Sequence, residues 1–278
     1  MAKIVWIASY PRSGHTWMRF LLANLLYGRV ESSVRLQELV PDIHRGVSGS
    51  QIHGNRKTLI KTHWRFVPDL PLREDTIGVI HILRHPLDVL VSNLNYVMLR
   101  GNLPPQLASE EARQAFERRW IDDYIAAGGY SRWREMGFGS WEENVGSWTE
   151  GALPYPRLVL RYEDMRADIA GTMAKVVRFL GIEADDATLG AAIERSSFQA
   201  MRALEEEEIA EARPGIFFDP SQRASLAAGL RFVRGAGRDP LSPAQRQRAL
   251  ERFAAFMARH GYGGNDALEP GQFGFGNG

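Results

Sequence analysis

The residues most able to do chemistry lie near the start of the chain, in a short loop with a cation at its centre. The loop reads Ser9-Tyr10-Pro11-Arg12-Ser13-Gly14-His15-Thr16-Trp17. A short apolar run precedes it and an apolar stretch with helical spacing follows, so we predict a strand, a tight turn and a helix in that order. In such a unit, loop N–H groups and the positive end of the helix dipole converge on an anion. The loop is therefore predicted to bind a phosphate-like group. The alternative is an ordinary strand-to-helix turn, in which these residue types are common.

The loop departs from the nucleotide-triphosphate pattern G-x-x-x-x-G-K-[ST] at two positions. Gly14 and Thr16 match the second glycine and the hydroxyl, but Ser9 replaces the first glycine and His15 replaces the lysine. The cation is Arg12, inside the loop. This pattern favours a site for phosphate-like oxygens without the lysine and magnesium of an NTPase.

A histidine follows the second apolar run. His63 comes directly after residues 58–62, two positions beyond Lys61. The near-neutral pKa of an imidazole suits proton abstraction from a hydroxyl, so His63 is a candidate base. A hydrogen-bonded surface histidine is the alternative.

The third and fourth apolar runs also end in polar side chains. Arg84 follows residues 76–83, and Ser92 lies about two turns into the helix predicted next. Arg84 and Ser92 could clamp a second phosphate, the arginine through its planar fork of donors. Tyr162 follows the last run and could line a nucleotide base.

The elements that must position these residues are strands alternating with helices. The predicted strands are residues 4–8, 58–62, 76–83 and 157–160, and the predicted helices are 16–27, 86–99, 110–127, 141–149, 168–180 and 242–260. This alternation predicts an α/β fold: a single domain with a central, mostly parallel sheet flanked by helices. Ligands of such sheets bind beyond the carboxyl ends of the strands, where all the candidate residues fall. We expect the domain to span residues 1–262 and the Gly-rich tail 263–278 to be disordered.

Composition excludes several classes of function. The 278 residues contain no cysteine, which excludes disulfides and thiolate metal sites, and the net charge of +1 gives no general attraction to nucleic acid or membrane. The first apolar run is too short for a signal peptide, and no run approaches the length of a membrane span. We therefore expect a cytoplasmic protein with no nucleic-acid or membrane partner and no metal.

In these motifs the chain resembles the sulfotransferases that use 3′-phosphoadenosine-5′-phosphosulfate (PAPS). The family's P-K-S-G-x-x-W loop is matched by residues 11–17, its K-T-H segment by residues 61–63, and its R-x-P-x-D-x-x-x-S segment by Arg84, Pro86, Asp88 and Ser92. Its G-S-W…W, Y-E-D and F-x-R-x-G stretches are matched by residues 139–148, 162–164 and 232–237. The matches occur in chain order over about residues 4–240. Arg12 departs from the family, because it replaces the loop lysine.

The resemblance implies in-line transfer of a sulfuryl group from PAPS, with PAP as the product and without a metal. His63 would act as the catalytic base, while Arg12 and Lys61 would stabilise charge on the leaving phosphate and the sulfuryl oxygens. The residues implied to bind the nucleotide are Pro11, Arg12, Ser13, Gly14, His15, Thr16, Trp17, Arg84, Ser92, Tyr162, Arg234, Gly235 and Gly237.

The acceptor is expected to be a small molecule with a hydroxyl group. Similarity to bacterial enzymes that decorate glycopeptide antibiotics favours a phenol or sugar on a bacterial natural product. Residues 28–57, 94–135 and 204–231 are expected to form the acceptor walls and lid. A P-loop NTPase or small-molecule kinase, and a non-catalytic nucleotide- or phosphopeptide-binding module, are the alternatives. The family's dimerisation signature is not recognisable, so no oligomeric state is predicted.

Overall fold

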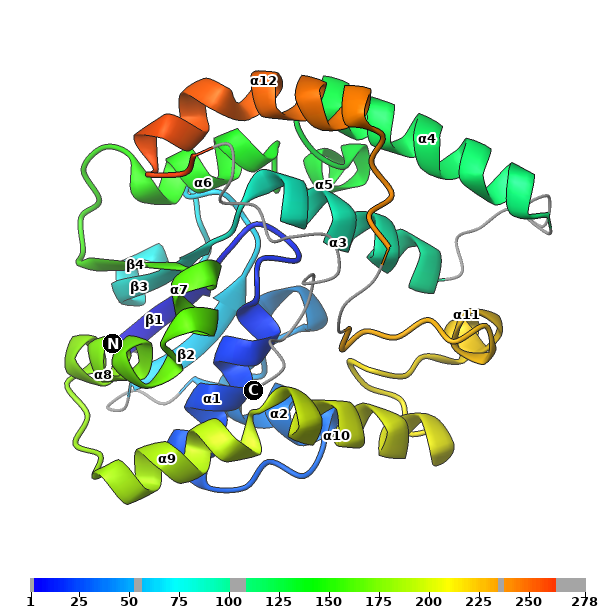
Figure 1. The fold of residues 1–278 in the computed structure, drawn as a ribbon. Helices are drawn as coiled ribbons and strands as arrows, with labels where there is room; N and C mark the ends of the chain where they lie inside the picture. Colours follow the sequence, from blue (N-terminus) through cyan, green and yellow to red (C-terminus); the bar gives the residue numbers. More distant parts are fainter. Residues whose placement is uncertain (1–2, 53–56, 101–108, 235–237, 264–278) are drawn as a thin grey trace.

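The computed structural model describes residues 3–52, 57–100, 109–234 and 238–263. Its centre is a sheet in the order β2-β1-β3-β4, in which every neighbouring pair is parallel (Figure 1). The strands are β1 (Lys3–Ala8), β2 (Lys57–Thr62), β3 (Thr76–Leu83) and β4 (Arg157–Arg161). The predicted α/β fold is confirmed, and the four predicted strands are confirmed to within one residue at each end.

The burial of β1 on both faces explains the layered architecture. Val5 and Ile7 belong to one core, whereas Ile4, Trp6 and Ala8 belong to another. Consecutive strand residues point to opposite faces, so a continuous apolar strand needs cover on both sides. Helices supply that cover on each face (Figure 1).

One face is covered by helices that share a core with Val5 and Ile7. These are α1 (His15–Tyr27), α2 (Ser33–Leu39), α8 (Ile169–Leu180), α9 (Asp186–Arg195) and α10 (Phe198–Ala210). On the opposite face, Trp148 of α6 (Trp141–Thr149) joins the cluster of Trp6. Trp141 of the same helix packs edge-on against Phe253 and Phe256 of α12 (Pro243–Arg259).

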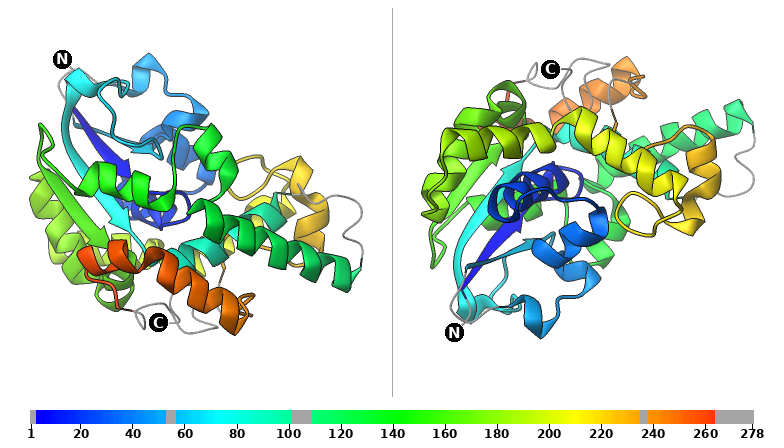
Figure 2. Two further views of the ribbon diagram at one scale, coloured as in Figure 1. Left: turned by 90° about the horizontal axis from the view of Figure 1, so that it is seen from above. Right: turned by 90° about the horizontal axis from the view of Figure 1, so that it is seen from below.

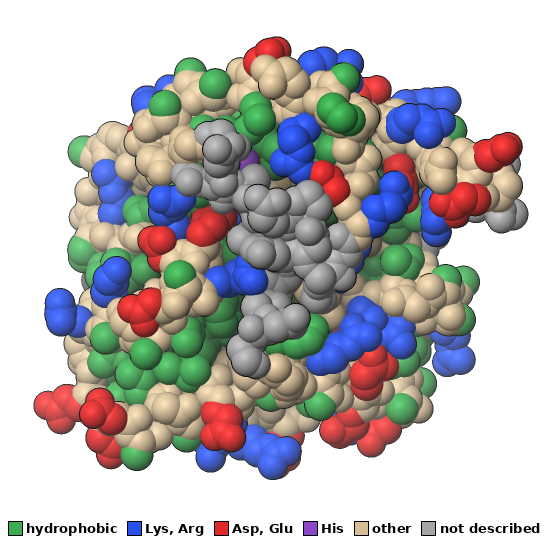
Figure 3. All heavy atoms as spheres, in the orientation of Figure 1, with side chains coloured by type: hydrophobic (Ala, Val, Ile, Leu, Met, Phe, Trp, Pro, Cys, Tyr) green, Lys and Arg blue, Asp and Glu red, His purple; other side chains and the backbone are tan. Residues whose placement is uncertain are grey.

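The remaining helices are α3 (Pro86–Leu99), α4 (Glu110–Ala127), α5 (Ser131–Glu135), α7 (Tyr162–Ala167) and α11 (Arg223–Ala227), with 3₁₀ turns at Ile43–Arg45, Gly49–Gln51, Arg73–Asp75 and Pro220–Gln222. Figure 2 shows α4 and α11 beyond the carboxyl ends of the strands. Acidic and basic side chains are interspersed over the face shown in Figure 3, in keeping with the near-zero net charge.

The six predicted helices are present, but the short helices α5, α7 and α11 and the longer helices α2, α9 and α10 were not predicted. Side chains of Ser32, Asp185 and Ser197 cap the first turns of α2, α9 and α10. The four consecutive glutamates of residues 205–208 have the polarity of a solvated segment, yet they lie in α10. Gly235, Gly237 and the predicted tail from residue 264 lie outside the described residues.

The sheet brings the candidate residues to one edge. Ala8 pairs with Thr62, and Leu83 pairs with Arg161, so the last residues of neighbouring strands are level. The candidates begin directly after these ends: the loop after β1, His63 after β2, Arg84 after β3 and Tyr162 after β4.

Candidate active site

The loop after β1 has the backbone of an anion site. Arg12 has φ 74° and Gly14 has φ 108°, both in the left-handed region. No side chain caps the first turn of α1, which begins at His15. The first N–H groups of a helix lack partners within the helix and lie at its positive end. Together with the turned loop backbone, they form a concave site suited to an anion.

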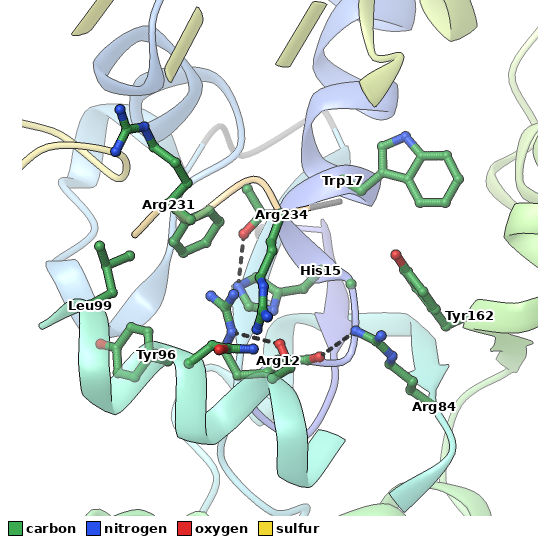
Figure 4. A pocket seen from close by; sticks show the side chains of 14 residues that line it. Arg12, His15, Trp17, Arg84, Tyr96, Leu99, Tyr162, Arg231 and Arg234 are labelled. Carbon is green, nitrogen blue, oxygen red and sulfur yellow. Dashed lines mark hydrogen bonds between the residues drawn. The ribbon is translucent and has the colours of Figure 1, made fainter. Parts of the chain in front are cut away.

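A pocket opens over this loop, and we call it the arginine pocket. Its empty volume is about 690 Å³, part of it open to solvent, and none of the described residues that line it is acidic. Figure 4 shows its arginines: Arg12 from the loop after β1, Arg84 from directly after β3, and Arg231 and Arg234 from one segment late in the chain. The other lining residues are Gly14, His15, Thr16, Trp17, Ser92, Asn95, Tyr96, Leu99, Tyr162 and Phe232. The donor set therefore suits a ligand with more than one anionic group.

A second pocket, which we call the histidine pocket, has an empty volume of about 710 Å³, part of it open to solvent. It is lined by Pro11, Arg12, His15, Thr16, Arg19, Asp42, His44, Arg45, Lys61, His63, Tyr96, Arg100, Trp133, Met136, Phe138, Ile216 and Phe232. Arg12, His15, Thr16, Tyr96 and Phe232 line both pockets, which therefore share a wall.

Arg12 lies in that shared wall and is held on several sides. Its Nε donates to Ser92 Oγ at 3.2 Å, and its Cζ lies 4.3 Å from the centre of the Phe232 ring and 5.4 Å from that of Tyr96. Cation–π contacts of this kind favour the charged guanidinium. Burial lowers the pKa of Arg12 to about 10, so the side chain stays charged at neutral pH.

Arg84 and two aromatic rings form the far side of the arginine pocket. Arg84 donates from Nη1 to the carbonyl oxygen of Arg12 at 3.3 Å, and its Cζ lies 4.2 Å from the Tyr162 ring centre. Trp17 meets Tyr162 edge-on, and its Nε1 donates to the carbonyl of Ser196 at 2.9 Å. The rigid aromatic surface is suited to a flat group such as a nucleotide base.

His15 stands where an NTPase would place its lysine, and it is a neutral residue here. Burial lowers its pKa well below the usual value of a histidine, and the charge of Lys61 acts in the same direction. Its Nε2 lies 3.2 Å from Thr16 Oγ1, while its Nδ1 is buried without a hydrogen-bond partner among the described residues.

His63 has one ring nitrogen occupied and lines the histidine pocket. Its Nδ1 lies 2.7 Å from the carbonyl oxygen of Ser9. A carbonyl oxygen only accepts, so Nδ1 carries the proton and the lone pair of the neutral ring is on Nε2. Burial, followed by the charge of Lys61, lowers the pKa of His63 well below its usual value. The site therefore holds a neutral imidazole whose Nε2 lone pair can accept a proton.

Two residues that the sequence did not single out hold the backbone of His63. Its N–H donates to His44 Nε2 at 2.8 Å, and its carbonyl accepts from Asn144 Nδ2 at 2.8 Å. The His44 ring also stacks on the His63 ring, with centres 5.7 Å apart. Burial lowers the pKa of His44 to about 4, consistent with its acceptor role.

Lys61 lines the histidine pocket in an ion pair. Its Nζ donates to Asp42 Oδ2 at 2.9 Å, and both side chains are buried. Burial lowers the pKa of Lys61 to about 8; burial also disfavours ionised Asp42, but Lys61 and Arg19 lower the pKa of that carboxyl. Both side chains are therefore ionised at neutral pH, and the negative charge of Asp42 partly neutralises the positive charge of Lys61.

The other predicted residues differ in their placement. Arg234 enters the arginine pocket (Figure 4), whereas the Ser13 side chain is buried within the loop, with an Oγ that has no partner among the described residues. Each of the three segments predicted as acceptor walls contributes to the histidine pocket, through residues such as His44, Trp133 and Ile216.

Two further observations concern metals and membranes. In the part of the chain that the structure describes, no three His, Asp or Glu side chains are grouped to hold a metal ion. Within the same residues, no helix has both the length and the apolarity needed to cross a bilayer.

The loop predicts a large penalty for a side chain at Gly14. A Cβ there would lie 2.5 Å from Tyr162 Cδ2, on a backbone at φ +108°. Gly28 has φ +79°, and a Cβ added there would have no atom within 4 Å. Gly28→Ala therefore measures the cost of the backbone conformation alone, about 1 kcal/mol, without a clash. We expect Gly14→Ala to lower the free energy of unfolding by a further 1–3 kcal/mol or so, measured by urea denaturation. Equal losses in the two variants would contradict the clash.

Comparison with known proteins gives a consistent family. The model of the sulfotransferase domain family matches residues 3–260. Sulfotransferase 4A1 of Mus musculus is 29% identical over 197 residues, which cover 68% of this chain and 64% of the relative. Sulfotransferase 1B1 of Mus musculus is 27% identical over 208 residues, which cover 70% and 64%. The matched part of the chain thus spans somewhat less than two thirds of these relatives' length.

Solved structures show a similar fold. A mouse sulfotransferase complexed with PAP has a TM-score of 0.58 at 22% identity, covering 92% of this chain and 84% of that one. Retinol dehydratase in complex with androsterone and inactive cofactor PAP has a TM-score of 0.54 at 16% identity, covering 91% and 80%.

Proposed function

Since the chain belongs to the sulfotransferase domain family, we propose that it transfers the sulfuryl group of PAPS to a hydroxyl group of a small-molecule acceptor. The observation that carries this proposal is the wall shared by the two pockets. Arg12 and His15 line both the arginine pocket, suited to a polyanionic nucleotide, and the pocket that contains His63. A donor in one pocket and an acceptor in the other would meet at that wall.

The residues of the arginine pocket fit PAPS. The loop N–H groups and Arg12 would hold the 5′-phosphosulfate, and Arg84, Ser92 and Arg234 the 3′-phosphate. The aromatic surface of Trp17 and Tyr162 would receive the base. Two buried polar atoms without a partner among the described residues, Ser13 Oγ and His15 Nδ1, lie at this loop and add to the polar groups available there.

His63 is proposed to remove the proton of the acceptor hydroxyl at Nε2. The acceptor oxygen then forms its bond to sulfur while the bond between sulfur and the 5′-phosphate oxygen breaks, and that oxygen keeps the electron pair. Arg12 and the N-terminus of α1 would stabilise the charge that develops there. Lys61 would contribute mainly through its electrostatic field, because it is paired with Asp42 and because its charge, added to burial, lowers the pKa of His63.

The histidine pocket favours an aromatic acceptor. Tyr96, Trp133, Phe138 and Phe232 give it flat walls, and Arg45 and Arg100 also line it. We propose that the acceptor group is a phenolic hydroxyl, with a sugar hydroxyl as the second choice. The acceptor molecule would be a bacterial natural product, and the reaction would take place in the cytoplasm. The sequence resemblance supports the bacterial setting, and the aromatic walls support the phenol.

The proposal is tested by incubating the protein with PAPS and a set of acceptors in a buffer that contains EDTA to remove metal ions. The acceptors are phenols and sugars, each in a neutral and an anionic form. We expect PAP and sulfated acceptor to form in equal amounts. A parallel arm contains ATP and Mg²⁺. Formation of ADP in that arm alone would indicate a kinase or NTPase, and saturable PAP binding without turnover of any acceptor would indicate a binding module.

A further inference from the structure

The acidic run of α10, residues 205–208, takes no part in the proposed reaction, yet half of it is buried. Glu205 and Glu208 are both 0% exposed, whereas Glu207 is exposed and pairs with Arg213. A buried carboxylate is costly unless its oxygens are hydrogen-bonded. The hydrogen-bond partners of each buried glutamate therefore indicate what that side chain does in the structure.

Glu205 binds the backbone of a distant segment. Its Oε1 accepts from the N–H of Phe232 at 2.6 Å, and its Oε2 accepts from the N–H of Val233 at 2.9 Å. Arg202, one turn earlier on α10, donates to the carbonyl of Val233 at 2.8 Å and lies 3.5 Å from the same carboxylate. Burial raises the pKa of Glu205 to about 7, and the two N–H donors act in the opposite direction.

The bound segment carries much of the arginine pocket. We call residues 230–234 the strap. Phe232 packs on the Arg12 guanidinium, and Arg231, Phe232 and Arg234 all line the pocket (Figure 4). Arg231 is itself held by Glu206, whose Oε1 accepts from its Nε at 2.9 Å. Residues 230–234 lie in neither a helix nor a strand, so the hydrogen bonds from α10 to their backbone and to Arg231 help to fix their position.

We propose that Glu205 is a positioning residue for the nucleotide: by binding the backbone of the strap, it holds Phe232 against Arg12 and Arg234 in the arginine pocket. This inference rests on the proposed function, because the nucleotide is the donor named there. The pocket is then preorganised, and less binding free energy is lost in ordering the strap. Hydrogen bonds to a charged group are strong enough for this role.

The test compares Glu205→Gln with Glu207→Gln, the matched change at the exposed position of the same helix. A glutamine amide has one oxygen, so its nitrogen would face a second N–H donor. We expect Glu205→Gln to raise the Kd of PAP, measured by titration calorimetry, by about tenfold or more. Glu207→Gln should change it by less than about twofold. If Glu205→Gln does not fold, Glu205→Asp, which keeps the charge on a shorter side chain, should show the same loss.

Two further readouts separate positioning from general stabilisation. Hydrogen exchange should show reduced protection of the Phe232 and Val233 amides in Glu205→Gln. In an Arg234→Ala background, the added loss of PAP affinity should be smaller than in the wild type. Wild-type-like PAP affinity in Glu205→Gln would overturn the inference and leave the proposed function standing. Failure of the wild-type protein to bind PAP would overturn both.

Discussion

His63→Ala is expected to lower kcat by about 10²–10⁴-fold while the Kd of PAP stays within about twofold of the wild-type value. The large fall in kcat follows from the loss of the proposed base. In His63, Nδ1 is hydrogen-bonded to the carbonyl of Ser9, which leaves Nε2 available for the acceptor. The small effect on PAP follows from its position, since His63 lines the histidine pocket and is absent from the lining of the arginine pocket. Steady-state kinetics and calorimetry with PAP measure the two quantities.

Added imidazole should restore part of the activity of His63→Ala, because it can occupy the vacated space and accept the proton. The pH profile gives a second measurement. Burial and the charge of Lys61 hold the pKa of His63 well below its usual value, and the proposed role as a base needs the neutral ring. At saturating PAPS, where protonation of Glu205 (pKa about 7) does not limit nucleotide binding, we expect kcat to stay level as the pH falls from 7.5 through 6.5 and to drop only under more acidic conditions. Undiminished turnover in His63→Ala would refute the assignment of the base.

Arg12→Ala is expected to lower kcat/KM for PAPS by about 10²–10³-fold, and Arg12→Lys by less. Arg12 is the charged residue in the wall between the pockets, where its guanidinium is fixed by Ser92, Phe232 and Tyr96. Its pKa of about 10 keeps it charged at neutral pH. A lysine keeps the charge, but it lacks the planar fork that can bind Ser92 and an anion together.

Kinetics with varied PAPS measure this effect, and Arg35→Ala provides the control. Arg35 is an exposed arginine whose ion pair is with Glu38, three residues along the same helix. Its loss should leave kcat/KM unchanged within about twofold, as expected of a surface ion pair. Retention of more than about a tenth of wild-type kcat/KM by Arg12→Ala would show that the loop N–H groups suffice without the cation.

Short, local patterns in the sequence predicted most of the fold and the residues that follow each strand at the candidate site. The run of residues 4–8 followed by a Pro/Ser/Gly loop predicts strand, turn and helix, because apolar spacing and turn residues act over a few positions. The same reasoning located His63 and Arg84, since residues after parallel strands meet at one edge. It did not predict α10, whose acidic run has the composition of a solvated face.

The sequence by itself thus determined the order of the elements, the tight loop after β1 and the residue types available at the edge of the sheet. Only the tertiary structure decided which neighbours those residues have: His44 and Asn144 beside His63, Asp42 beside Lys61, and Glu205 beneath the strap. The bonds of His44 and Asn144 to His63 join residues 19 and 81 positions apart, and that of Glu205 to Phe232 joins residues 27 apart. No local periodicity records such pairs, because they form only when the packing of the whole chain brings the side chains together and excludes water from them.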